Sequence, residues 1–198
     1  SIHDNMLLGI DLLPWSGVSG PTPNDAQDAD TNGGNAFQNY PEITGTEIVG
    51  NTLSVNGILE STPNSVYSIE IFVSPECDPS GFGEGQVFLG SAEVNTDASG
   101  STLFEAVFET VTPIGWVVSA TATELVSGNT SEFSPCESVV GSACIADMNN
   151  DDLLNFFDVS AFLSAFSMQN PLADFNNDGQ FNFFDVSAFL SAFAAGCP

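Results

Sequence analysis

"DFNNDGQFNFFDVSAFLSAF", residues 174–193, decides the fold of the C-terminal part of the chain, because residues 147–166 repeat its pattern as "DMNNDDLLNFFDVSAFLSAF". In each copy a stretch rich in Asp and Asn precedes apolar residues at the helical spacing i, i+3, i+4 and i+7. These apolar residues are Val159, Phe162, Leu163 and Phe166 in the first copy, and Val186, Phe189, Leu190 and Phe193 in the second. Each copy is therefore predicted to be a loop that leads into a short helix with one apolar face.

The Asp-rich part of each copy has the ligand spacing of a calcium loop. Such a loop uses side-chain oxygens at positions 1, 3, 5 and 12, a backbone carbonyl at 7, often a water at 9, and Gly at 6. The second copy places Asp174, Asn176, Asp178, Gln180, Asn182 and Asp185 at the ligand positions, with Gly179 at the turn. The first copy places Asp147, Asn149, Asp151, Leu153, Asn155 and Asp158 there. Its turn residue is Asp152, which is expected to strain the turn or weaken the first site. An Asx-rich turn that caps a helix without a metal is the alternative.

Composition supports a metal as the counter-charge. The chain has 198 residues, 42% of them apolar, which is enough for one large domain or two small ones. It has 26 acidic residues and no Lys or Arg, so a divalent cation is the obvious partner for clustered carboxylates. Nucleic acid and anionic membrane surfaces are excluded as partners because both are bound through Lys and Arg. No apolar run approaches the roughly 20 residues of a membrane span.

Residues 41–140 show the two-residue period of β-strands. One face of each run is apolar in "VYSIEIFV", "FEAVFE" and "GWVVSATATEL", and these inward positions are Tyr67, Ile69, Ile71, Val73, Phe104, Ala106, Phe108, Trp116, Val118, Ala120 and Ala122. Six or seven such strands predict an antiparallel sandwich of immunoglobulin-like type. Residues 1–40 are expected to form a strand or two followed by a long polar loop. The predicted fold class is therefore mainly β with a small α module.

A third acidic motif occurs in the polar loop. "DADTNG" places Asp28, Asp30 and Asn32 at calcium spacing before Gly33. This spacing fits a third calcium ion, and it fits a plain Asx turn equally well.

The four cysteines are Cys77, Cys136, Cys144 and Cys197. They lack C-x-x-C spacing, and the chain has a single His, so two disulfides in an oxidising compartment are predicted in place of a zinc site. Three pairings are open. We favour Cys77 with Cys136 and Cys144 with Cys197, because each pair would lie at the margins of one module.

Residues 144–198 resemble a dockerin module, because the duplicated calcium loop ends in Asp and is followed directly by a short helix. The ending "AAGCP" resembles the variant found at the extreme C-terminus of secreted, surface-anchored bacterial proteins. The resemblance implies calcium at the loops and attachment to a protein partner. In cellulosomal dockerins, positions 10 and 11 help to choose the cohesin partner, and here they are Phe156, Phe157, Phe183 and Phe184, unlike the hydroxyl-rich cellulosomal pattern. At least one Phe of each pair is expected to fill the small core.

The middle of the chain also resembles a known module. "SPECDPSGFGEGQVFLGSAEV" and "SATATELVSGNTSEFSPC" are similar to an immunoglobulin-like repeat of large bacterial surface proteins. Residues 1–40, with "NMLLGIDL" and "TPNDAQDADTNGGNAFQNYPEI", resemble the last turn and exit loop of a right-handed parallel β-helix. These resemblances imply extracellular display without enzymatic activity.

We therefore expect a secreted, noncatalytic, calcium-binding surface protein, with the sandwich as spacer and residues 144–198 as the attachment module. No nucleophile elbow or phosphate loop is present, and Glu70, Glu105 and Glu109 alternate outward from the predicted strands. Two alternatives stay open. The chain can be the subunit of an extracellular filament built from copies of itself, or the accessory C-terminal part of a carbohydrate-active enzyme.

Overall fold

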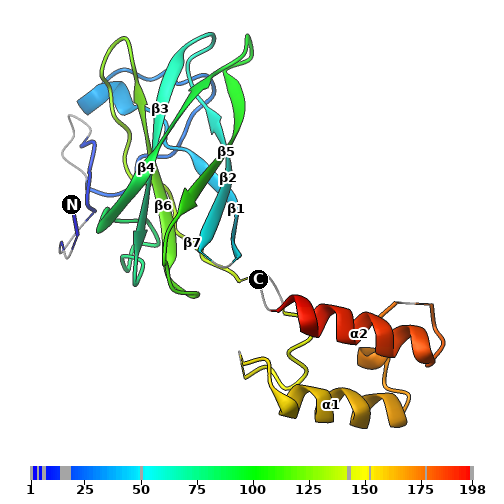
Figure 1. Ribbon diagram of the computed structural model, residues 1–198. Coiled ribbons are helices and arrows are strands. Elements are labelled where there is room, and N and C mark those ends of the chain that lie inside the picture. The colour runs from blue at the N-terminus through cyan, green and yellow to red at the C-terminus, as the bar shows by residue number, and fades with distance from the viewer. Residues whose placement is uncertain are drawn as a thin grey trace. The chain divides into compact units, whose positions relative to one another are not determined.

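The computed structural model describes residues 2–3, 5, 8–13, 19–49, 51–141, 144–151, 153–176 and 178–196. The chain forms two compact units, Ser1–Val140 and Gly141–Pro198 (Figure 1). No helix within the described ranges is both long enough and apolar enough to cross a bilayer.

The first unit is a sandwich of two antiparallel sheets. One sheet has the strand order β1-β2-β5 and the other β4-β3-β6-β7. The strands are β1 (Glu42–Val49), β2 (Thr52–Glu60), β3 (Val66–Ser74), β4 (Val87–Asn95), β5 (Ser101–Glu109), β6 (Val117–Glu124) and β7 (Glu137–Ser138). Two packed antiparallel sheets in which sequence neighbours change sheet are the architecture of an immunoglobulin-like sandwich, which confirms the prediction for this part of the chain.

The predicted inward faces build the core between the sheets. Tyr67, Ile69 and Ile71 of β3 have no exposed surface, and Phe104 and Ala106 of β5 are also buried. Because side chains alternate along a strand, the intervening polar residues face away from this core. The alternation therefore correctly located the core strands.

A close approach between β2 and β5 requires glycine. Gly57 pairs with Phe104 in the register of these strands. A Cβ atom built on Gly57 would lie 2.3 Å from the Phe104 ring. Because Gly57 has no side chain, the Phe104 ring can pack directly on the backbone of β2.

The N-terminal segment lies against the sandwich, but the strand predicted in "NMLLGIDL" is not present in its described residues. Ile2 forms an isolated bridge with Gly85, and among the described residues of this segment the 3-10 helix η1 (Gly34–Phe37) is the one named element. The backbone N–H groups of Leu12 and Thr22 donate instead to the buried Glu132 carboxylate, each at 2.8 Å. The Glu132 side chain thus accepts the backbone hydrogen bonds that a neighbouring strand would otherwise accept.

One disulfide is confirmed in the first unit. Cys77, in the loop after β3, is bonded to Cys136, directly before β7, with a Cα–Cα distance of 6.0 Å. Cys144 is also disulfide-bonded. Its predicted partner, Cys197, lies outside the described residues.

The second unit contains the helices α1 (Phe156–Ser167) and α2 (Phe183–Ala195), joined by the 3-10 helix η2 (Pro171–Ala173). Phe162 and Phe189 are 1% exposed and form its centre, with the ring of Phe175 edge-on to both. Leu163 and Leu190 belong to the apolar face of each helix, but they are 55% and 52% exposed. Each of two short helices packs on a single partner, so the buried stripe is narrower than the apolar stripe in the sequence.

Candidate metal centre

The two Asp-rich loops make the same hydrogen bonds 27 residues apart in the sequence. In the first loop, Asp151 N donates to Asp147 Oδ1 (3.2 Å) and Asn149 Oδ1 (3.0 Å), while Asn149 Nδ2 donates to Asp151 Oδ2 (2.9 Å). In the second loop, the equivalent bonds of Asp178 and Asn176 measure 3.1, 3.1 and 3.0 Å. The side chains at positions 1, 3 and 5 therefore turn to the same side of each loop.

The last carboxylate of each loop is buried and belongs to the first turn of a helix. Asp158 accepts hydrogen bonds from Asn155 N (2.9 Å), Met148 N (3.0 Å) and Asn149 N (3.4 Å), and it has no exposed surface. Asp185 has equivalent donors at 2.8 and 3.4 Å and is equally buried. Because backbone N–H groups stabilise the ionised form, the pKa of both carboxyls is lowered. Both are therefore charged at neutral pH.

Three carboxylates converge in the first loop. One oxygen from each of Asp147, Asp151 and Asp158 lies within 4.8 Å of the others. Asp147 is 8% exposed, and its side chain lies within hydrogen-bonding reach of Asp158. Residues 141–198 contain no Lys, Arg or His, so no side chain of this unit can neutralise the group. Adjacent buried carboxylates need a cation or a shared proton, and an oxygen-only donor set suits a hard divalent ion such as Ca²⁺.

The second loop holds its carboxylates less closely. Within the described part of the chain, Asp174, Asp178 and Asp185 do not form a comparable group. Asp174 accepts hydrogen bonds from two backbone N–H groups of its own loop, those of Asp178 (3.1 Å) and Gly179 (2.9 Å). The turn residue of the first loop, Asp152, lies outside the described residues. The loop expected to be the weaker site is thus the one whose carboxylates already converge.

The residues at position 9 are helix caps. Asn155 Oδ1 accepts from Phe157 N (2.7 Å), and its Nδ2 donates to the carbonyl of Leu153 at position 7 (2.9 Å). Asn182 Oδ1 accepts from Phe184 N (2.8 Å), and both helices begin with a complete capping box. Because each Asn oxygen already serves the helix, these residues would reach an ion through water. Asn155 and Asn182 therefore cap the helices that follow the two loops.

The third predicted site has a different membership. One carboxylate oxygen from each of Asp25, Asp28 and Asp30 lies within 4.8 Å of the others, so Asp25 joins the two predicted aspartates. Asp28 accepts from Asn39 N and Ser61 Oγ, both at 3.0 Å. Burial raises its pKa to about 6.

The sequence analysis missed Asp25, because the calcium-loop spacing was counted from Asp28 at every second residue toward the C-terminus. The backbone turns back at Gln27 and Asp28, which have φ values of 61° and 54°. This turn brings Asp25 beside the motif that follows it. Asp25 also accepts from Ala29 N at 3.0 Å. The acidic group therefore organises its own loop.

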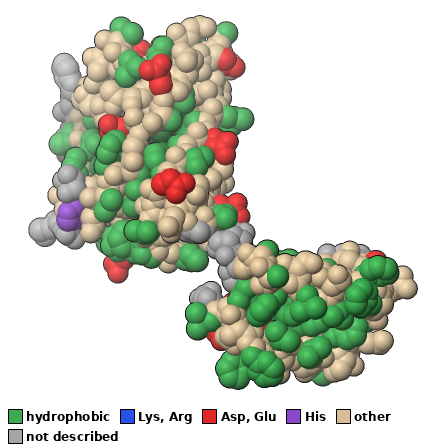
Figure 2. Space-filling view, in the orientation of Figure 1, with side chains coloured by type: hydrophobic (Ala, Val, Ile, Leu, Met, Phe, Trp, Pro, Cys, Tyr) green, Lys and Arg blue, Asp and Glu red, His purple; other side chains and the backbone are tan. Residues whose placement is uncertain are grey.

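The four phenylalanines at positions 10 and 11 are all exposed, so the expectation that one of each pair fills the core is wrong. Phe156 and Phe183 are 76% exposed, and Phe157 and Phe184 are 65% and 66% exposed. The rings of each pair make an edge-to-face contact, with centroids 6.5 and 6.4 Å apart. Figure 2 shows one face of the second unit, on which hydrophobic side chains cover a broad area. Phe162 and Phe189 already fill the centre, so the first-turn rings remain outside.

Comparisons with known proteins give fold-level similarity only. No family model matches the chain, and no curated protein matches it. Among solved structures, the BSP domain of a biofilm associated protein aligns at 21% identity with a TM-score of 0.34, covering 55% of this chain and 15% of that one. The cupredoxin domain of amoB from Nitrosocaldus yellowstonii aligns at 12% identity with a TM-score of 0.30, covering 54% of this chain and 90% of that one.

A CARDB domain from Pyrococcus furiosus, solved in complex with di-metal ions, aligns at 14% identity with a TM-score of 0.27. It covers 60% of this chain and 100% of that domain. Similarities of this size carry no argument about function. The immunoglobulin-like sandwich of the first unit follows from its own strand order.

Proposed function

We propose that this chain is a secreted, noncatalytic surface protein whose C-terminal unit is a calcium-dependent, dockerin-like attachment module. The observation that carries the proposal is the convergence of Asp147, Asp151 and Asp158 in a unit that has no cationic side chain. Two of these carboxylates are buried, which is costly unless a cation offsets their charge.

Calcium would act here as a structural ion. Asp147, Asn149, Asp151 and Asp158 would hold the first ion, and Asp174, Asn176, Asp178 and Asp185 the second, with backbone carbonyls at Leu153 and Gln180. The ion would offset the repulsion within each loop and fix the first turn of the helix that follows. Binding of metal would therefore be coupled to folding of the second unit.

Attachment is supported by the apolar surface that this small unit leaves exposed. Four first-turn phenylalanines, together with Leu163 and Leu190, remain accessible on the two helices. Monomeric proteins rarely expose contiguous apolar patches of large size without a binding role. The sandwich would serve as the spacer, and its disulfide suits an oxidising, extracellular compartment.

Calcium titration of the full chain by calorimetry tests the proposal. Two binding events are expected, one of which is lost in Asp147→Asn and the other in Asp174→Asn, while the exposed sandwich variant Glu105→Gln keeps both. Among the described residues, α-helices occur only in the second unit, so loss of helical circular dichroism on adding EDTA would report its unfolding. Absence of calcium binding would overturn the proposal. A large assembly that disperses on chelation, seen by light scattering, would favour the filament.

A further inference from the structure

The second unit has a groove that is lined by equivalent residues of the two repeats. The groove has a volume of about 400 Å³. Apart from Asn150, the residues that line it form pairs separated by the 27-residue period, and three of these pairs are Ile145 and Leu172, Asp147 and Asp174, and Met148 and Phe175. Both repeats thus contribute the same positions, and each wall is the counterpart of the other.

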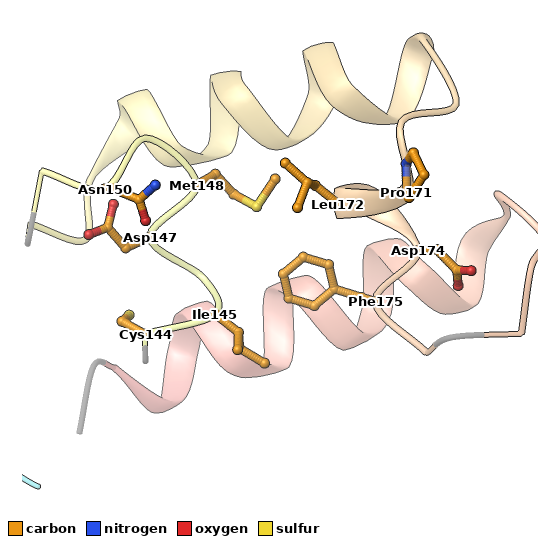
Figure 3. Close-up of a pocket in the computed structure, with 9 residues that line it drawn as sticks. All are labelled: Cys144, Ile145, Asp147, Met148, Asn150, Pro171, Leu172, Asp174 and Phe175. Atoms are coloured by element: carbon orange, nitrogen blue, oxygen red, sulfur yellow. The ribbon is translucent and has the colours of Figure 1, made fainter. Parts of the chain in front are cut away.

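The centre of the groove is apolar and open. Figure 3 shows the side chains of Met148, Leu172 and Phe175 converging on the same space. Ile145 and Leu172 are 64% and 71% exposed, although they are large aliphatic residues. Between them and the loops, Ala146 and Ala173 are fully buried in the core and hold both walls in place.

The arrangement follows from the geometry of the loops. Odd positions of each loop turn toward the predicted ion, so the side chain at position 2 is directed elsewhere. Met148 and Phe175 occupy position 2 and line the groove. Asp147 and Asp174 occupy position 1 and lie at opposite ends of it (Figure 3). The groove is therefore an apolar centre between two acidic ends.

Charge selects the occupant. Residues 141–198 contain seven Asp and no Lys, Arg or His, so the four positive charges of two calcium ions would leave the unit negative. A second copy of the chain carries the same excess of negative charge and no Lys or Arg. Complementarity therefore favours a basic partner over self-association.

We propose that this groove binds a protein partner that inserts one large apolar side chain flanked by Lys or Arg. The apolar side chain would contact Met148, Leu172 and Phe175, and the flanking cations would face Asp147 and Asp174. A groove of this volume with apolar walls and few polar groups is typical of binding sites. The inference names the partner chemistry of the proposed attachment role and rests on that role.

Methionine NMR gives a direct test on the full calcium-treated chain. Met148 lines the groove, whereas Met168 is 68% exposed elsewhere in the same unit and serves as the internal control. With methyl-¹³C-methionine, the peptide acetyl-Gly-Lys-Phe-Lys-Gly-amide is expected to shift the Met148 methyl signal and leave Met168 unchanged. Replacing both Lys of the peptide by Glu, or its Phe by Ala, should raise the dissociation constant about tenfold or more. Added salt should weaken binding of the Lys peptide.

A matched pair of variants assigns the response to the groove. Leu172→Ser should abolish the Met148 shift, while Leu190→Ser, also on an exposed apolar position, should keep it. Equal shifts with the Lys and Glu peptides would overturn the proposal, and so would a shift of Met148 that appears only as the protein concentration rises. Calorimetry on the same samples separates the two claims. Calcium binding without a Met148 response rejects the groove alone, and a Met148 response without calcium binding rejects the calcium proposal alone.

Discussion

The rings of Phe162 and Phe189 stack in parallel with their centroids 4.1 Å apart. These residues are equivalent in the two repeats, so each half of the C-terminal unit completes the core of the other. Neither half could bury its central ring alone.

Phe162→Ala is expected to destabilise the second unit by about 3–5 kcal/mol, because it removes half of this stack and leaves a cavity. Thermal melting followed by helical circular dichroism measures the effect. Phe156→Ala, in the same helix but 76% exposed, should change stability by no more than about 0.5 kcal/mol. Equal effects of the two substitutions would show that the stack is not the core.

Acid should weaken the second unit through Asp185. Its folded-state pKa is lowered by backbone donors, first among them Asn182 N, so its contribution is present above the unfolded pKa of about 3.9. That contribution is lost as the pH falls through the folded pKa. In calcium-containing buffer, Asp185→Asn should therefore be less stable than the wild type at pH values well above the unfolded pKa, and the difference should disappear in acid. A difference that is independent of pH would contradict this role.

Asp28 should give the first unit the opposite dependence. Its folded pKa is raised to about 6 because of burial, so protonated Asp28 contributes stability below the unfolded value of about 3.9, and this is lost as the pH rises through about 6. Asp28→Asn keeps an acceptor for Asn39 N and should remove that part of the slope. Melting of the first unit at several pH values, followed by fluorescence of the partly buried Trp116, provides the measurement. A slope that persists unchanged in the variant would assign it to other carboxylates.

Removing the Cys77–Cys136 disulfide should destabilise the first unit by about 4 kcal/mol, since the bond closes a loop with a sequence separation of 59. The double variant Cys77→Ala, Cys136→Ala tests this by denaturant unfolding. The single-site control Ser99→Ala changes an exposed turn residue and should have a small effect. Unfolding of the second unit, followed by its helical signal, should be unaffected by the double variant.

Local patterns predicted the parts of the fold that depend on local rules. The two-residue period placed Tyr67, Ile69 and Ile71 inward, and repeat spacing located both helices. The same rules failed where packing against another element decides which side chains are buried. Periodicity marks an apolar stripe on α1, but it does not say which edge of the stripe meets α2, so the exposure of Leu163 could not be predicted.

In the candidate sites, too, the sequence identified residues within one continuous segment and missed those that the fold brings together. Spacing identified Asp147, Asp151 and Asp158, which the structure brings together, because a calcium loop is a continuous segment. Asp25 joined Asp28 only through a backbone reversal that odd-position spacing ignores. The buried Glu132 carboxylate depends on Leu12 and Thr22, more than a hundred residues away, and no local pattern could indicate it.

The position of Cys136 has a mechanical consequence. The chain leaves the sandwich through β7, which has two residues paired with β6, and through Val139 and Val140, which bond to the backbone of Trp116 and Ile48. A pull on the C-terminal end would reach Cys136 as soon as β7 detached, and there the load would pass through a covalent bond to the loop after β3. Residues 78–135, which lie inside the loop closed by this disulfide, would therefore be shielded from the tension.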